Sequence, residues 1–296
     1  MDSWWEGVAG KGLLISSFMC CGYRNDSHQK KLKLNFLWNK IINMIPKVIH
    51  YCWFGGNPLP ASAKKCIASW RKYLPDYEIK EWNESNFDVN IIPYTAEAYK
   101  AKKYAFVSDY ARFWILYKYG GLYFDTDVEV IKNMDDIIAK GAFMGCENEA
   151  KPGATPAQLG VAPGLGLGVN PGLGLYGEIL EIYKDKHYIL EDGTFSRETV
   201  VTITTELLCK YGLKNTNDVQ EVAGVLIYPK EYFCPKDYVT GRMDLTNNSV
   251  SIHHYDASWL PWYVLMEHKL CYKFHIPCKD VLNKLFYTKS FWKNHF

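Results

Sequence analysis

The sequence predicts an α/β fold, in which helices alternate with the strands of a mostly parallel sheet. Three observations predict it. Apolar, β-rich runs at 48–54, 77–82 and 122–131 alternate with helical patterns at 61–73 and 104–119. Glycine and proline residues separate these runs. This alternation is typical of strands joined by crossover helices.

The first strand is expected over 48–54 because its apolar, β-branched and aromatic residues end in Gly55-Gly56-Asn57-Pro58, a strong loop signal. The helix over 61–73 has its apolar residues on one face and is stopped by Pro75. A second strand is expected over 77–82.

A longer helix is predicted over 104–119, ending where Gly120-Gly121 permits a left-handed backbone. A single third strand is expected over 122–131. The glycine- and proline-rich segment 151–177 lacks the Lys of a phosphate-binding loop, so we interpret it as active-site loop and turn structure. Later elements are expected to be a helix over 198–211 and, over 225–233, a strand followed by a loop.

The composition excludes some classes of partner. The chain has 296 residues, of which 48% are hydrophobic and 22% charged, which is ordinary for a soluble globular protein. A formal net charge of +2 gives no support for nucleic-acid binding. The nine cysteines are scattered without a paired C-x-x-C pattern, which favours a reducing, cytoplasmic location. The high aromatic content, 16%, is first of all expected to fill the core.

Three parts are predicted along the chain. Residues 1–44 form an N-terminal extension that is either not native or poorly ordered, since the apolar run at 13–21 is too short to cross a bilayer and Met44 offers a later start. Residues 45–262 form the main domain. Residues 263–296 form a basic, aromatic, helical tail, which either lies on an anionic membrane surface or docks on the domain with a solvated basic face.

Two acidic residues near the third strand carry the chemistry. If 122–131 is one strand, Tyr123, Asp125, Asp127 and Glu129 project from the same face. Two carboxylates on an otherwise apolar strand are costly unless a cation meets them. A hard divalent ion shared with phosphate oxygens satisfies both, at a sheet end where α/β folds bind ligands.

The preceding helix adds Asp109 and Arg112, which share a face at i,i+3 spacing. Arg112 can offer donors to a diphosphate, and Asp109 can accept from sugar hydroxyls. Each signal alone is weak, because Asp-x-Asp pairs occur on solvated turns and Asp–Arg pairs on surfaces. An EF-hand is disfavoured because Val130 stands where that loop needs glycine. The joint occurrence favours a functional site.

The motifs together resemble glycosyltransferase family 32, which includes capsular polysaccharide enzymes and yeast-type initiating mannosyltransferases. The sugar-binding region of that family is similar to the catalytic domain of large glucosylating toxins. The resemblance covers about 45–262 and implies a GT-A fold, a nucleotide-sugar donor, Mn2+ or Mg2+, and retention of anomeric configuration. It is carried by IPKVIHYCWFGG at 45–56, SDYAR at 108–112 and GGLYFDTD at 120–127.

The resemblance also implies residue roles. Trp53 would stack on the donor base; the donor would be held by Ser108, Asp109, Arg112 and Tyr123; Asp125 would meet the ribose and the metal; and Asp127 would be the direct metal ligand. The late segment 253–262 resembles the closing segment of metal-dependent retaining transferases. In it His254 would be a further metal ligand, His253 structural, and Ser258 and Trp259 closing-loop contacts. Leu260 stands where relatives use a basic residue, so the diphosphate must be gripped elsewhere.

The function predicted is a retaining hexosyltransferase that moves a sugar from a nucleotide-diphosphate donor to a saccharide or glycolipid acceptor in cell-surface polysaccharide or lipid-linked oligosaccharide synthesis. The cytoplasmic location includes the inner face of the membrane if the tail binds lipid. If a side chain forms a covalent intermediate, Glu147 is the nearest downstream acid with motif-like surroundings, although a loop carboxylate is the favoured interpretation. The alternatives are a nucleotide-sugar hydrolase or nucleotidyltransferase, and a non-catalytic carbohydrate-binding relative.

Overall fold

The computed structural model describes residues 44–238, 240–256, 266–267, 270–271 and 273–274. The chain divides into two compact units, Met1–Met44 and Ile45–Phe296, and everything described below lies in the second. Most of the predicted extension and most of the tail over 263–296 lie outside the described residues, so the three-part division stays a prediction. Among the helices that are described, none is long and apolar enough to cross a membrane.

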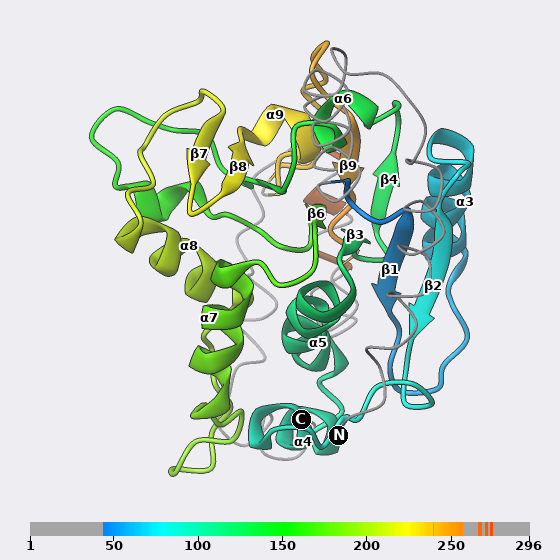
Figure 1. Cartoon of the computed structure of the whole chain (residues 1–296), viewed down its shortest axis with the longest axis vertical. Coiled ribbons are helices and arrows are strands. Elements are labelled where there is room, and N and C mark those ends of the chain that lie inside the picture. The colour runs from blue at the N-terminus through cyan, green and yellow to red at the C-terminus, as the bar shows by residue number, and fades with distance from the viewer. Residues whose placement is uncertain (1–43, 239, 257–265, 268–269, 272, 275–296) are drawn as a thin grey trace, which may run out of the picture. The chain divides into compact units, whose positions relative to one another are not determined.

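A seven-stranded mixed sheet forms the centre of this unit, with the strand order β2-β1-β3-β6-β5-β8-β7 (Figure 1). β1 pairs in parallel with β2 and β3, and β5 with β8, whereas β6 and β7 run antiparallel to their neighbours. The predicted fold class, a Rossmann-like mixed sheet flanked by helices, is confirmed. The strands are β1 (Val48–Cys52), β2 (Glu78–Trp82), β3 (Gly121–Tyr123), β5 (Phe143–Gly145), β6 (Leu167–Val169), β7 (Gln220–Val222) and β8 (Val225–Tyr228).

The alternation of side chains along β1 separates two apolar cores. Ile49 and Tyr51 belong to one core with α3 (Ala61–Tyr73), while Cys52 belongs to the other. The second core also contains the apolar faces of α4 (Pro93–Lys100), α5 (Tyr104–Tyr119), α7 (Gly174–Lys184) and α8 (Val200–Lys210). Burial on both faces explains the nearly continuous apolar runs of the central strands.

The third strand differs from the prediction. Instead of one strand over 122–131, the chain forms β3, a turn, and β4 (Val128–Val130), which pairs antiparallel with β9 (Ser251–His253) in a separate two-stranded sheet. The turn is closed by the Val128 N–H, which donates to the Asp125 carbonyl over 3.0 Å. The expected common face of Asp125, Asp127 and Glu129 is therefore wrong, because the turn redirects the chain between them.

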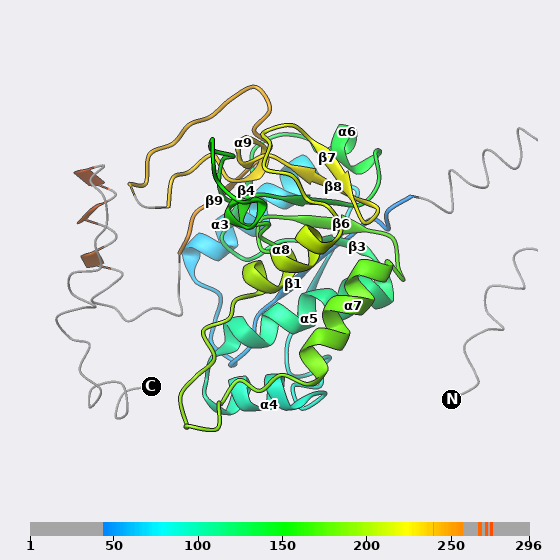
Figure 2. The same cartoon turned by 90° about the vertical axis from the view of Figure 1, so that its left-hand side faces the viewer.

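The second half of the unit is more regular than predicted. The segment 151–177 contains η1 (Pro156–Leu159), β6 and the start of α7, so only part of it is loop. The expected helix over 198–211 is found as α8. After β8 the chain enters the short helix α9 (Lys230–Phe233) and a long connection that returns to β9, seen in yellow and orange in Figure 2. A further short helix, α6 (Asp135–Ile138), links β4 to β5.

Candidate active site

Arg112 joins two of the predicted acidic residues. Its Nη2 lies 3.0 Å from Oδ1 of Asp109 and 3.3 Å from Oδ1 of Asp125. Its Nε donates to the Ser108 carbonyl over 3.1 Å, and its guanidinium lies 5.0 Å from the centre of the Tyr123 ring. The helical spacing of residues 108, 109 and 112 on α5 brings these groups to one face. The structure thus brings together Ser108, Asp109, Arg112, Tyr123 and Asp125 as predicted.

The acidic partners of Arg112 differ in exposure. The Asp109 side chain is 12% exposed and that of Asp125 is 29% exposed. Burial raises the pKa of Asp109 to about 7, against the attraction of Arg112 and with added repulsion from Asp125. Asp125 Oδ1 also accepts from the Tyr123 hydroxyl over 3.0 Å. Asp125 is therefore the member of this group that is fixed by two donors yet still reachable from solvent.

A glycine in the segment before β6 packs directly on Asp125. A Cβ at Gly164 would lie 2.1 Å from Asp125 Oδ2 and 3.4 Å from Arg112 Nη1. The Asp125 N–H donates to the Gly164 carbonyl over 3.1 Å. Only a residue without a side chain fits this approach. Gly164 is a site residue that the sequence reasoning did not identify individually, although the run Pro163-Gly164-Leu165-Gly166 was its signal.

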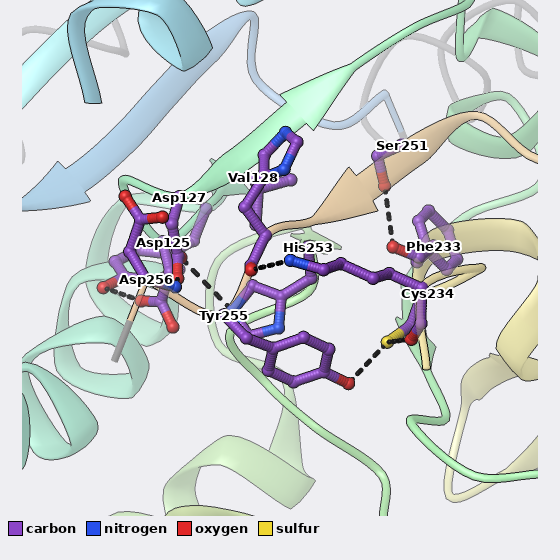
Figure 3. Close-up of polar contacts among 12 residues, drawn as sticks. Asp125, Asp127, Val128, Phe233, Cys234, Ser251, His253, Tyr255 and Asp256 are labelled. Atoms are coloured by element: carbon purple, nitrogen blue, oxygen red, sulfur yellow. Dashed lines mark hydrogen bonds and ion pairs between the residues drawn. The ribbon is translucent and has the colours of Figure 1, made fainter. Parts of the chain in front are cut away.

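Asp127 lies on the other side of the turn and meets β9. Its Oδ1 lies 3.2 Å from His253 Nε2, and its Oδ2 accepts from the Asp256 N–H over 3.0 Å (Figure 3). Burial alone would raise the pKa of Asp127, but His253 and the Asp256 N–H outweigh it and lower that pKa to about 2. Although burial opposes it, Asp127 raises the pKa of His253 well above its ordinary value. These opposite shifts favour an ionised Asp127 next to a protonated His253.

The structure places the side chain of His253, not that of His254, beside the Asp127 carboxylate. His254 was expected beside Asp127, but its Nε2 lies 2.8 Å from Glu129 Oε2, which Lys65 also contacts at 3.2 Å. Only the His254 N–H reaches Asp127, at its carbonyl oxygen. β9 ends at His253 and pairs it with Val128, so strand alternation carries the His253 ring, not the His254 ring, to Asp127. The metal-binding role of His254 stays a prediction.

Trp53 follows β1 at the start of a fixed loop. Its indole N–H donates to the Asn57 carbonyl over 2.6 Å, and the side chain is half-buried against the core. Gly55 has φ of 93°, and a Cβ there would lie 2.3 Å from the Tyr104 ring. The structure gives Trp53 no contact with Arg112 or the acidic residues, so its donor contact stays a prediction. Ser258 and Trp259 lie outside the described residues.

His50 holds together two elements that supply residues of the candidate site. Its Nδ1 accepts from the Trp82 indole N–H over 3.0 Å, so Nε2 carries the proton and donates to the Gly120 carbonyl, also over 3.0 Å. Burial lowers the pKa of His50 to about 4, so the ring is neutral. It fixes the junction between α5 and β3, the elements that supply Arg112 and Asp125.

The donor groups fit a hard divalent cation. Asp127 is ionised far below neutral pH and Asp125 is partly exposed, so both can offer carboxylate oxygens, as Mn2+ or Mg2+ prefers. Within the part of the chain that the structure describes, no group of three or more His, Cys, Asp or Glu side chains is assembled to hold a metal.

Comparison with known proteins assigns this region to a family. Residues 60–144, which carry α5, Arg112, Asp125 and Asp127, match the family model described as glycosyltransferase sugar-binding region containing DXD motif. This match confirms, over residues 60–144, the resemblance to a glycosyltransferase family that the motifs carry.

Curated relatives agree with this assignment. The chain is 33% identical over 102 residues to inositol phosphoceramide mannosyltransferase 3 of Schizosaccharomyces pombe, covering 32% of this chain and 27% of that protein. It is 34% identical over 106 residues to an uncharacterized glycosyltransferase of Acanthamoeba polyphaga mimivirus, covering 34% of this chain and 42% of that protein. The matches thus span less than half of each relative. Among solved structures, the PaToxG glycosyltransferase aligns with a TM-score of 0.41 at 19% identity, over 60% of this chain and 76% of that one.

Proposed function

We propose that the chain is a metal-dependent, retaining glycosyltransferase that moves a sugar from a nucleotide-diphosphate donor to an acceptor hydroxyl. The observation that carries the proposal is the position of Arg112 between Asp109 and Asp125, with Asp127 on the same turn as Asp125. This group lies within the segment matched to the DXD-containing sugar-binding region. A buried guanidinium next to partly exposed carboxylates suits a sugar diphosphate, which offers both hydroxyls and anionic oxygens.

Each residue has a separate task in the proposed reaction. Asp109 accepts a hydrogen bond from a sugar hydroxyl, and Arg112 donates to the diphosphate as the bond to C1 weakens. Asp125 and Asp127 would hold Mn2+ or Mg2+, which, when bound, supplies positive charge to the leaving diphosphate. Gly164 keeps Asp125 against Arg112, and Trp53 stacks on the base. Burial raises the pKa of Glu147, and no role as a nucleophile is assigned to it.

The relatives suggest which substrates to test first. Those of Schizosaccharomyces pombe are named as mannosyltransferases for inositol phosphoceramide. A mannose-containing donor and a glycolipid acceptor are therefore our first proposal, and a polysaccharide such as a capsule component is the second. A cytoplasmic location, at the inner membrane face if the basic tail binds lipid, completes the proposal.

The test uses labelled nucleotide sugars incubated with the whole chain, with and without Mn2+ and with and without acceptor. We expect sugar to move to the acceptor only when Mn2+ is present, with the anomeric configuration of the donor retained. Release of free sugar at the same rate with and without acceptor would instead identify a nucleotide-sugar hydrolase. Transfer of the nucleoside monophosphate to an acceptor would identify a nucleotidyltransferase. Absence of turnover with every donor would identify a non-catalytic relative.

A further inference from the structure

A hollow of about 590 Å³ lies outside the group of Arg112, Asp125 and Asp127. Four acidic side chains and two basic ones line it, together with polar and small apolar residues and no aromatic ring. Alternating carboxylates and cationic donors suit the hydroxyl groups of a pyranose or cyclitol ring. The charged lining consists of Glu149, Lys230, Glu231, Asp237, Arg242 and Asp244.

One wall of the hollow is a hairpin, described over 235–238 and 240–244. Lys236 and Met243 form an antiparallel bridge, and the Asp244 N–H donates to the Pro235 carbonyl over 2.9 Å. The Lys236 ammonium donates to the His254 carbonyl over 2.5 Å, which fastens the hairpin next to β9. His253, on β9, lies 3.2 Å from Asp127. The hairpin is therefore hydrogen-bonded to the segment that completes the candidate active site.

Glu147 lies within electrostatic range of both His253 and Lys230, a lining residue of the hollow. This carboxylate follows β5, and its N–H donates to the Gly160 carbonyl over 2.9 Å. It is close enough to both His253 and Lys230 for each to stabilise its charge. Because Lys230 lines the hollow and His253 pairs with Asp127, Glu147 interacts electrostatically with one residue of each place.

The rim of the hollow is apolar and exposed. Met243 lines the hollow and is 43% exposed, and Leu245, just beyond the hairpin, is 53% exposed. The side chains of Lys230 and Arg242 make no hydrogen bond or ion pair with any residue that the structure describes. Polar groups inside and apolar groups at the edge suit a molecule with a hydroxyl-rich head and an apolar tail.

We propose that this hollow binds the saccharide or cyclitol headgroup of a lipid-linked acceptor, whose apolar part lies on Met243 and Leu245. This inference rests on the proposed function and names the acceptor site for it. Lys230 and Arg242 donate to headgroup hydroxyls, and Glu149 accepts from them. The acceptor hydroxyl is thereby held on the Glu147 side of the Asp127–His253 pair.

The experiment compares octyl and methyl glycosides of mannose, glucose and galactose as acceptors, with donor and Mn2+ at saturation. We expect octyl glycosides to have a KM lower by about tenfold than the matching methyl glycosides, since the alkyl chain gains apolar contact. Met243→Ser combined with Leu245→Ser removes that difference. Lys230→Ala and Arg242→Ala raise the KM of both by about tenfold. Lys210→Ala, at an exposed position on α8, is the matched control.

Donor binding, followed by thermal shift in every variant, separates the two proposals. The hollow variants should bind donor as the unsubstituted chain does. An unsubstituted chain that binds no donor overturns the proposed function and this inference with it. If donor binds normally and sugar is transferred, two results overturn only the acceptor site. One is an equal KM for octyl and methyl glycosides, and the other is an unchanged KM in Lys230→Ala and Arg242→Ala.

Discussion

Gly164 and Asp125 are so close that a Cβ at residue 164 would lie 2.1 Å from Asp125 Oδ2. Asp125 in turn contacts Arg112 through both of its carboxylate oxygens, at 3.3 and 3.4 Å. The segment before β6 therefore sets the position of the acidic residue that Arg112 holds. The absence of a side chain at residue 164 is part of the site's geometry.

Gly164→Ala should displace the Asp125 carboxylate while leaving the two apolar cores intact. We expect kcat/KM for transfer to fall by about 100-fold, since a shift on the order of 1 Å in a reacting group has this effect. The free energy of unfolding should fall by about 1–3 kcal/mol from the overpacking. Steady-state kinetics and urea unfolding measure the two quantities.

The matched control for this substitution is Gly174→Ala, because no heavy atom lies within 4 Å of a Cβ built there. Alanine is also the better helix former at that position in α7. Equal activity of the Gly164→Ala and Gly174→Ala proteins would show that Asp125 need not be held where the structure places it.

The two neighbouring histidines should differ in their effect on metal affinity. His253→Gln removes the imidazole that lies 3.2 Å from Asp127 and should change the apparent Mn2+ affinity by about 10- to 100-fold. His254→Gln removes a contact with Glu129 and should change it by less than about twofold. Titration of transfer activity with Mn2+ compares the two variants. A larger effect of His254→Gln would support the prediction from the sequence that His254 is the metal ligand.

The neutral state of His50 predicts a pH dependence of stability. Burial lowers its pKa from 6.5 to about 4, so the unfolded chain binds a proton between these values and the folded chain does not. Its contribution is fully present above pH 6.5 and is lost as the pH falls toward 4. Between these limits its share of the slope of unfolding free energy approaches about 1.4 kcal/mol per pH unit.

His50→Gln removes this titration while keeping an amide donor near the position of Nε2 for the Gly120 carbonyl. We expect the variant to be less stable at pH 7 but to show a shallower fall in unfolding free energy between pH 6.5 and 4.5. Urea unfolding at a series of pH values gives both slopes. Parallel curves for the two proteins would mean that folding does not lower the pKa of His50.

The sequence predicted the fold class and the Arg112 group because both depend on local patterns. The helical spacing of Asp109 and Arg112 and the glycines before β3 fix those residues without reference to distant segments. The turn between β3 and β4 was missed because the apolar residues at 122, 124, 128 and 130 keep a period of two on both sides of it. Strand periodicity cannot show where one sheet ends and another begins. The position of His253, rather than His254, beside Asp127 has a related cause. Which side chains of β9 face Asp127 depends on the register of β9 against β4.

The contact between Gly164 and Asp125 could not be predicted from spacing, because it joins segments that are 39 positions apart in the chain. The glycine-rich run marked the segment, but only its close approach to Asp125 distinguishes residue 164 from the glycines around it. The hairpin that forms one wall of the acceptor hollow likewise depends on a bridge between Lys236 and Met243.

The central claim is that Asp125 and Asp127 bind a nucleotide-sugar diphosphate together with a divalent cation. The most direct measurement is a thermal-shift screen of nucleotide sugars with and without Mn2+, made on the unsubstituted chain, on Asp127→Asn, and on Asp185→Asn as an exposed control. We predict that one donor raises the Tm by about 5 °C or more only when Mn2+ is present, in the unsubstituted and Asp185→Asn chains but not in Asp127→Asn. Equal stabilisation without Mn2+, or in Asp127→Asn, would contradict the claim.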